Sequence, residues 1–233
     1  MKNKRKIKQE DKNVISTKIS LIGKVASKLG VNNKFHKYEQ DYIKDDNRFF
    51  ISPVDAKVVA MGDIKEDGVI ISKSNKEISL KEVVGEDAKL FSGGFYLNLY
   101  LSPKNRHYWR IPYDSELKSM KLNEGKAFLA VFIGLEKIFK NKDYFKKAIK
   151  KNANVGMIFK TPSFMYSMIP VGSLNVNGIN IINDNDSKYK KGDLGGYFSI
   201  GSSMLICFPK GNFEVILNKG DNVTIGQNII KII

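Results

Sequence analysis

Cysteine, histidine and tryptophan are scarce in this 233-residue sequence, which contains one, two and one of them. The single cysteine, Cys207, cannot form a disulfide within the chain, and its position in an apolar run predicts a small buried side chain. Two histidines and one cysteine are too few to assemble a zinc site from the usual ligands. We therefore expect neither a disulfide framework nor a metal centre.

Long apolar runs are also missing. The longest, residues 127–135, falls far short of the roughly 20 residues that a helix needs to cross a bilayer. The basic N-terminus, residues 1–6, is not followed by the apolar core of a secretory signal. These absences predict a soluble or peripheral protein located inside the cell.

Basic residues, by contrast, are in excess. The chain has 39 Lys and Arg against 24 Asp and Glu, which gives a formal net charge of +15. Such a charge attracts polyanions, either nucleic acid or an anionic lipid surface, although a generally lysine-rich surface would produce the same excess. No basic-aromatic motif of a nucleic-acid-binding module is present, which disfavours nucleic acid as the partner.

Apolar residues near the N-terminus follow a helical spacing of four, three, four and three. They are Ile15, Ile19, Ile22, Ala26 and Leu29. The spacing predicts an amphipathic helix that ends at Gly30, with lysines beside its apolar stripe. This helix could lie on an anionic membrane or equally well pack against its own domain. We assign it to a basic N-terminal segment, residues 1–45, that precedes a main domain over residues 46–233.

From residue 49 onward the sequence changes to short β-rich segments separated by Gly, Asp or Asn. Strands are predicted at residues 58–60, 69–71, 95–101, 155–159, 166–171, 174–182, 203–208, 213–217 and 229–233. One further helix is expected over residues 143–151, where apolar residues gather on one side. The predicted class is α+β and predominantly β, with a barrel-sandwich-like β core and peripheral helices.

Three turn-like segments carry residue types that can activate a nucleophile. Asp55 lies in a proline-containing turn before a strand, His107 follows an alternating strand, and Ser202 follows Gly201 at a bend that enters an apolar strand. A strained serine after glycine can attack its own backbone, helped by a base that a carboxylate orients. Each residue alone also fits a structural role, as an Asx turn, a surface loop histidine and a turn serine. His36 has no motif around it and is expected at the surface.

These segments, in this order, resemble the motifs of the phosphatidylserine decarboxylase family. Residues 52–55 resemble its S-P-x-D-G segment, and residues 91–107 resemble its G…YLSP…H segment. Residues 170–179 resemble the V-G-A-x-x-V-G-x-I stretch, and residues 191–203 resemble the KGxExGxFxxGST cleavage segment. The likeness runs from about residue 50 to the C-terminus.

The resemblance implies a self-cleaving proenzyme and a carboxy-lyase of phospholipid biosynthesis. Asp55 would orient His107, and His107 would deprotonate Ser202. The serine would then attack the Gly201 carbonyl, and the cleaved chain would carry a covalent pyruvoyl cofactor made from Ser202. That group would take the amine of phosphatidylserine and accept electrons as CO2 leaves, which yields phosphatidylethanolamine.

The resemblance also implies where the protein works. Arg106 and Arg110 are basic residues that could meet the substrate carboxylate or phosphate. The expected partner is an anionic phospholipid membrane, with the protein peripheral on its cytoplasmic face and the N-terminal helix as the docking element. The oligomeric state is not determined by the sequence, and a homodimer stays open.

Two departures from the family pattern leave alternatives open. Ala56 stands where the family usually has glycine, and Leu194 stands where it usually has glutamate. His107 and Arg110 form an H-x-x-R pattern that is similar to that of compact members. The alternatives are an uncleaved, non-catalytic lipid-binding relative and a pyruvoyl-dependent decarboxylase of another amino-acid-like substrate.

Overall fold

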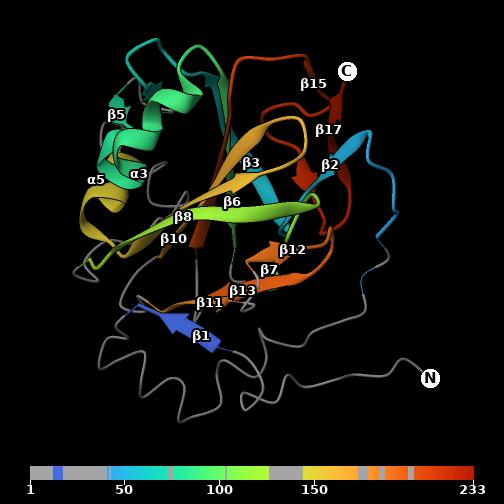
Figure 1. Ribbon diagram of the computed structural model, residues 1–233. Coiled ribbons are helices and arrows are strands. Elements are labelled where there is room, and N and C mark those ends of the chain that lie inside the picture. Colours follow the sequence, from blue (N-terminus) through green and yellow to red (C-terminus); the bar gives the residue numbers. More distant parts are fainter. Residues whose placement is uncertain are drawn as a thin grey trace.

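An eight-stranded antiparallel sheet forms the centre of the fold in the computed structural model (Figure 1). The structure describes residues 13–17, 41, 43–72, 76–102, 104–125, 144–172, 178–183, 187–198 and 202–233. In spatial order the strands of this large sheet are β12 (Lys188–Tyr189), β8 (Ser115–Asn123), β9 (Asn154–Lys160), β10 (Met165–Gly172), β14 (Ser202–Phe208), β6 (Phe95–Leu101), β3 (Ala56–Asp63) and β16 (Asn222–Val223).

Smaller elements surround the large sheet. A four-stranded sheet has the order β1 (Asn13–Ser16), β11 (Ile179–Asn183), β13 (Leu194–Phe198) and β7 (Tyr108–Arg110). A three-stranded sheet contains β15 (Phe213–Val215), β17 (Asn228–Ile232) and β2 (Phe49–Ile51), and a hairpin joins β4 (Val69–Ile71) to β5 (Glu77–Ser79). The helices within the described residues are α3 (Lys81–Val84), the 3-10 helix η1 (Gly85–Phe91) and α5 (Tyr144–Lys151).

Both faces of the large sheet are buried, and alternate side chains of the same strands point into two different cores. Leu97 and Leu99 of β6 join a core shared with the four-stranded sheet, whereas Tyr96 joins the core beneath α3 and α5. Because successive side chains point to opposite faces, a strand between two cores must be apolar throughout. This explains the apolar run of β14, where Cys207 is fully buried as predicted. Burial raises the pKa of the Cys207 thiol to about 12, so the thiol stays protonated at neutral pH.

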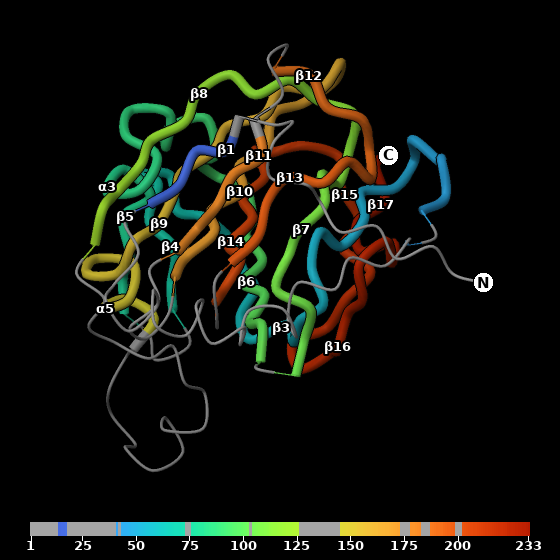
Figure 2. Tube along the Cα trace, turned by 90° about the horizontal axis from the view of Figure 1, so that it is seen from below, coloured from blue at the N-terminus to red at the C-terminus, as the bar shows by residue number. Residues whose placement is uncertain are grey.

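Three neighbouring strands of the large sheet connect to three neighbouring strands of the four-stranded sheet. β10 leads to β11, β6 leads to β7, and β13 leads to β14. The order is β10-β14-β6 in one sheet and β11-β13-β7 in the other, so β13 and β14 are the middle strands of the two sets (Figure 2). The middle connection runs from Phe198 to Ser202, and it includes the Gly201–Ser202 bond.

Most sequence predictions in the described residues are confirmed. Each predicted strand overlaps an observed one, and the helix expected at residues 143–151 is α5. The strand predicted at 174–182 is β11 from Ile179 onward, and residues 173–177 lie outside the described residues. The structure is predominantly β, with antiparallel sheets and two short α-helices. The finer barrel-sandwich class stays a prediction.

The predicted N-terminal helix is wrong at its start. Ile15 lies in β1, where it pairs with Ile181 of β11, and Thr17 N–H donates to the Ile179 carbonyl at 3.0 Å. These backbone bonds to a distant strand replace the local bonds that a helix would have made. The rest of the apolar stripe, residues 18–29, lies outside the described residues. The domain boundary at residue 45 stays a prediction, although residues 13–17 add a strand to the main fold.

Candidate active site

Ser202 is the first residue of β14, where the middle connection ends. This is the strand entry that the sequence predicted. It pairs with Gly172 at the end of β10 and with Leu101 at the end of β6. Its side chain is fully buried, and its Oγ forms no hydrogen bond with any described residue. An unsatisfied buried polar group costs about 1–3 kcal/mol. The Ser203 hydroxyl is in the same state, so what distinguishes Ser202 is its position directly after Gly201.

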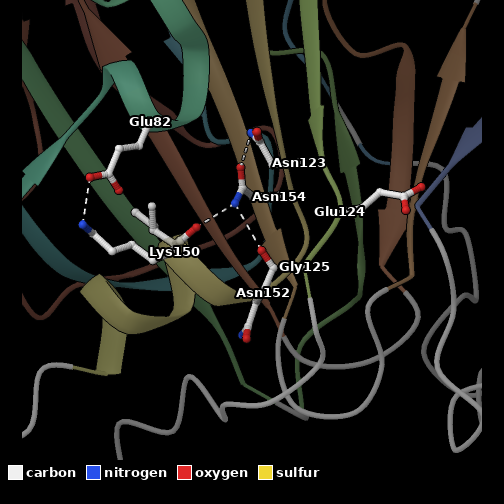
Figure 3. A pocket seen from close by; sticks show the side chains of 8 residues that line it. Glu82, Asn123, Glu124, Gly125, Lys150, Asn152 and Asn154 are labelled. Carbon is white, nitrogen blue, oxygen red and sulfur yellow. Dashed lines mark hydrogen bonds and ion pairs between the residues drawn. The ribbon is translucent and has the colours of Figure 1, made fainter.

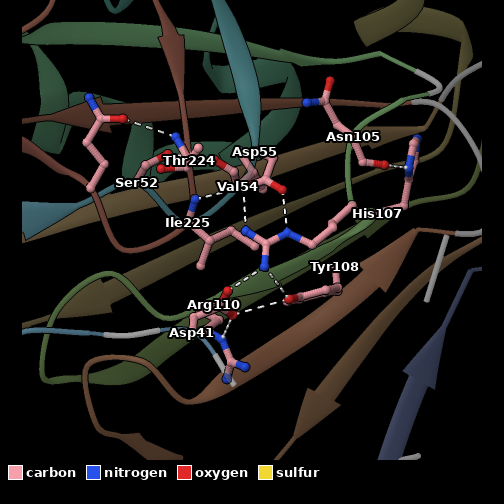
Figure 4. Close-up of polar contacts among 12 residues, drawn as sticks. Asp41, Ser52, Val54, Asp55, Asn105, His107, Tyr108, Arg110, Thr224 and Ile225 are labelled. Carbon is pink, nitrogen blue, oxygen red and sulfur yellow. Dashed lines mark hydrogen bonds and ion pairs between the residues drawn. The ribbon is translucent and has the colours of Figure 1, made fainter. Parts of the chain in front are cut away.

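A tight turn in the connection from β6 to β7 holds His107 (Figure 4). Asn105 Oδ1 accepts hydrogen bonds from the Ser102 backbone N–H at 2.8 Å and from the Ser102 hydroxyl at 2.7 Å. The Asn105 carbonyl oxygen lies 2.7 Å from His107 Nδ1. A carbonyl oxygen can only accept, so we assign the proton to Nδ1, and the lone pair of the neutral imidazole is then on Nε2. His107 is fully buried, so the interpretation as a surface loop histidine is wrong.

The backbone of His107 contacts one end of the middle connection, and Ser202 is the other end. The His107 carbonyl oxygen accepts a hydrogen bond from Phe198 N–H at 2.7 Å, and Phe198 is the last residue of β13. Residues 199–201, which lie outside the described residues, then lead to Ser202. This stretch can span at most about 14 Å from Phe198 to Ser202. The His107 backbone and Ser202 are therefore separated by no more than this stretch and one hydrogen bond.

Asp55 lies in the predicted turn directly before β3. The Ser52 hydroxyl donates to the Val54 carbonyl at 2.7 Å and closes this turn. Asp55 Oδ1 accepts from Ile225 N–H at 2.8 Å and from Arg106 Nη2 at 2.7 Å, and Asp55 Oδ2 accepts from Arg106 Nε (Figure 4). Both carboxylate oxygens are thus occupied by a two-pronged pair with a guanidinium.

The predicted contact between Asp55 and His107 is not present among the described residues. Arg106, the residue before His107, takes both carboxylate oxygens because its planar fork offers two parallel donors, whereas an imidazole offers one. The hydrogen bond to Asp55 raises the pKa of Arg106 above its usual value, so the guanidinium stays charged. Asp55 therefore acts on the position of His107 through its pair with Arg106, the preceding residue, and not through a hydrogen bond to the imidazole.

Asp41 completes this cluster, and no sequence motif indicated it. Its two carboxylate oxygens accept from Arg106 and Arg110, and the Tyr108 hydroxyl donates to Oδ2 at 3.2 Å. Arg110 also donates to the Gly192 carbonyl at 2.9 Å. The two arginines, predicted as substrate ligands, thus have acidic partners within the chain. Asp41 falls in the predicted N-terminal segment, so only its contacts reveal its place beside His107.

The glycines of the cleavage segment allow β13 to lie close against Trp109. A Cβ atom on Gly196 would lie 2.3 Å from Cζ2 of Trp109 and 2.3 Å from the Asn180 carbonyl oxygen. A Cβ atom on Gly195 would lie 2.6 Å from Nε1 of the same indole. The Trp109 ring also packs against Phe198, with 4.8 Å between ring centroids. The glycine-rich stretch therefore sets the position of the strand that delivers the middle connection.

Replacing Gly196 by alanine is expected to destabilise the fold by about 1–3 kcal/mol, because the methyl group would overlap the indole and a backbone oxygen. Thermal unfolding of Gly196→Ala should show this loss. Gly62→Ala in β3 is the matched control, since its Cβ would meet Tyr96 at an ordinary 3.6 Å. Equal melting temperatures for the two variants would contradict the packing argument.

A polar hollow of about 310 Å³ opens at the end of the large sheet where β14 begins (Figure 3). Its lining residues are Glu82, Asn123, Glu124, Gly125, Ile149, Lys150, Asn152 and Asn154. Asn152 Nδ2 donates to the Gly172 carbonyl at 2.9 Å, and Gly172 pairs with Ser202. Carboxylates, amides and a lysine line one space there, and together they offer partners for both signs of charge.

Comparison with known proteins agrees with this arrangement. A family model described as phosphatidylserine decarboxylase matches residues 32–231. The chain is 27% identical over 218 residues to a phosphatidylserine decarboxylase proenzyme of Coxiella burnetii, covering 84% of this chain and 74% of the relative. It is 28% identical over 208 residues to one of Francisella philomiragia, covering 80% and 71%.

A third relative is more similar over a shorter span. The phosphatidylserine decarboxylase proenzyme of Anoxybacillus flavithermus is 32% identical over 167 residues, covering 71% of this chain and 60% of the relative. The matched family region includes every described residue of the cluster around His107 and Ser202. The chain belongs to the phosphatidylserine decarboxylase family.

Proposed function

We propose that the chain cleaves itself between Gly201 and Ser202 and then decarboxylates phosphatidylserine to phosphatidylethanolamine with the pyruvoyl group formed from Ser202. The observation that carries this proposal is the buried Ser202 hydroxyl, which has no hydrogen bond to any described residue and lies on the connection that His107 contacts. A hydroxyl in that state fits a group that is consumed in a reaction. The family supports the substrate, and the relatives' name of proenzyme supports the cleavage.

Self-cleavage needs a base, a nucleophile and a carbonyl. His107 Nε2 accepts the hydroxyl proton as Ser202 Oγ bonds to the carbonyl carbon of Gly201. The peptide C–N bond then breaks, the Ser202 nitrogen takes up a proton, and an ester joins the two residues. Loss of the Ser202 Cα proton breaks the Cβ–Oγ bond and releases Gly201 as a carboxylate. Water finally displaces the nitrogen as ammonia and leaves a ketone at position 202.

The same residues have a place in the later decarboxylation. The pyruvoyl group supplies a ketone carbonyl that binds the substrate amine and accepts the electron pair released as CO2 departs. His107, held by the Asn105 carbonyl, would return a proton to the carbon that lost CO2. One imidazole would thus serve as base during maturation and as acid during turnover.

Intact-mass measurement of the purified chain tests the cleavage. We expect two chains, residues 1–201 and 202–233, whose summed mass equals the precursor plus one water minus one ammonia. Ser202→Ala should remain a single chain because it lacks the attacking oxygen. Ser203→Ala, which removes the neighbouring buried hydroxyl, is the matched control and should still cleave. An intact wild type, or a cleaved Ser202→Ala, would contradict the proposal.

One observation favours the second candidate, an uncleaved lipid-binding relative. Both oxygens of Asp55 accept from Arg106, so this carboxylate is engaged by a guanidinium instead of orienting His107 as the family resemblance implied. The same mass measurement separates the two candidates, because a non-catalytic relative stays in one piece. Release of CO2 from carboxyl-labelled phosphatidylserine in detergent, compared with release from free serine, then tests the substrate.

The partner in this proposal is an anionic phospholipid membrane that the protein meets from the cytoplasmic side. None of the helices in the described residues is long and apolar enough to span a bilayer. The formal charge of +15 supports attraction to an anionic leaflet. Because Ile15 lies in a strand, a helix starting there is not available as the docking element.

A further inference from the structure

Helix α5 presents a dense group of lysines to solvent. Its apolar residues Phe145, Ala148 and Ile149 are buried against the large sheet. The opposite side carries lysines that, together with Lys76 before β5, line a hollow of about 280 Å³. Within the described residues, the lining consists of Lys76, Lys146, Lys147, Lys150 and Lys151. We call these five residues the α5 lysine surface.

Among the described residues, two glutamates interact with lysines of this surface. Glu82 pairs with Lys150 at 2.8 Å, and Glu77, which pairs with Lys65, also interacts electrostatically with Lys146. Lys76, Lys147, Lys150 and Lys151 are exposed side chains. A concave surface lined by several like charges attracts an anion strongly, and the attraction weakens as salt is added. The surface therefore fits a partner that carries several negative charges.

The α5 lysine surface lies at the same end of the large sheet as Ser202. The helix ends at Lys151, and the next residue, Asn152, donates through Nδ2 to the Gly172 carbonyl at 2.9 Å. Gly172 N–H in turn donates to the Ala153 carbonyl at 2.9 Å, and Gly172 pairs with Ser202. Since β9 and β14 flank β10, the end of α5 is about 10 Å from the start of β14 along the sheet.

We propose that the α5 lysine surface is where this protein docks on an anionic lipid bilayer. The inference rests on the proposed function, because a substrate with its acyl chains in the bilayer can reach Ser202 only if this end of the sheet faces the membrane. The lysines at that end then meet the anionic head groups. Nucleic acid would also be attracted by the charge, but it would have no reason to bind beside the site of a lipid substrate.

The test is vesicle co-sedimentation of the full chain. Vesicles of phosphatidylcholine mixed with phosphatidylglycerol are compared with vesicles of phosphatidylcholine alone. The variant K147E/K151E reverses two exposed charges of the α5 lysine surface. The matched control K160E/K210E reverses two exposed lysines at the other end of the large sheet, the last residue of β9 and the second residue after β14, and has the same formal net charge.

We expect wild type and K160E/K210E to bind the anionic vesicles equally, and K147E/K151E to bind at least about tenfold more weakly. The difference should shrink as salt is raised. Equal binding by all three proteins, or an equal loss in both variants, would overturn the proposal. Binding to duplex DNA that only K147E/K151E loses, with vesicle binding unchanged, would reassign the surface to nucleic acid.

Two further measurements separate this inference from the proposed function. Melting temperatures show that both variants are folded, and intact mass shows whether each chain is cleaved. If the inference is right, K147E/K151E cleaves itself normally and decarboxylates phosphatidylserine normally in detergent, but it loses activity on anionic vesicles. Absence of cleavage in all three proteins would refute the proposed function while leaving the vesicle comparison valid.

Discussion

Replacing His107 by asparagine is expected to slow cleavage of the Gly201–Ser202 bond by about 10²–10⁴-fold. Asparagine keeps an N–H donor that can reach the Asn105 carbonyl, which accepts from His107 Nδ1 at 2.7 Å. It has no counterpart to the basic Nε2, so the turn can keep its shape while the proton acceptor is lost. The fraction of cleaved chain is followed over time after cell-free synthesis, by gel and by intact mass.

The chain's other histidine provides the control. His36→Asn, which lies outside the described residues, should cleave at the wild-type rate because no motif connects it to the site. A His107→Asn protein that melts like wild type but stays uncleaved would identify the imidazole as the base. Normal cleavage of a folded His107→Asn would mean that another group removes the Ser202 proton.

The parts of the site that follow strand order could be predicted from sequence. The alternating residues 95–101 form β6, because a period of two is typical of a strand. The apolar run after Gly201 forms β14, because a short run of apolar residues is typical of a strand buried on both faces. The four family-like segments proved to be neighbours for a simple reason. Each includes or adjoins the end of a strand at the same end of the large sheet: the end of β10, the start of β14, the end of β6 or the start of β3.

Contacts between distant segments could not be predicted in the same way. Ile15 has helical spacing to the apolar residues after it, yet it pairs with Ile181, and Ser16 Oγ donates to Asn180 Oδ1 at 2.7 Å. A short periodic stretch does not show that a distant strand has an edge with unpaired backbone groups. Tertiary pairing with such an edge overrides local helix preference. The same limit applies to Asp55, because a turn motif does not show which side chain pairs with its carboxylate in the folded structure.

The carboxylate of Asp41 joins Arg106 to Arg110, and its loss is expected to destabilise the fold. Asp41→Asn is expected to lower the free energy of unfolding by about 3 kcal/mol, because it leaves two guanidiniums without the carboxylate that joins them. Denaturant unfolding should be measured on a Ser202→Ala background, where the chain cannot be cut. Asp87→Asn is the control, since that carboxylate accepts a hydrogen bond from the Ser119 hydroxyl at 2.7 Å and has no arginine partner.

Cleavage rates of Asp41→Asn and Asp55→Asn then distinguish the two roles. If Asp55 acts on His107 only through Arg106, both variants loosen the same guanidinium and should slow cleavage to a similar extent, with a double variant little slower than either. This is the result we expect from the contacts of Arg106. Cleavage that collapses in Asp55→Asn but stays near normal in Asp41→Asn, at matched stability, would show instead that Asp55 leaves Arg106 and contacts the imidazole directly during the reaction.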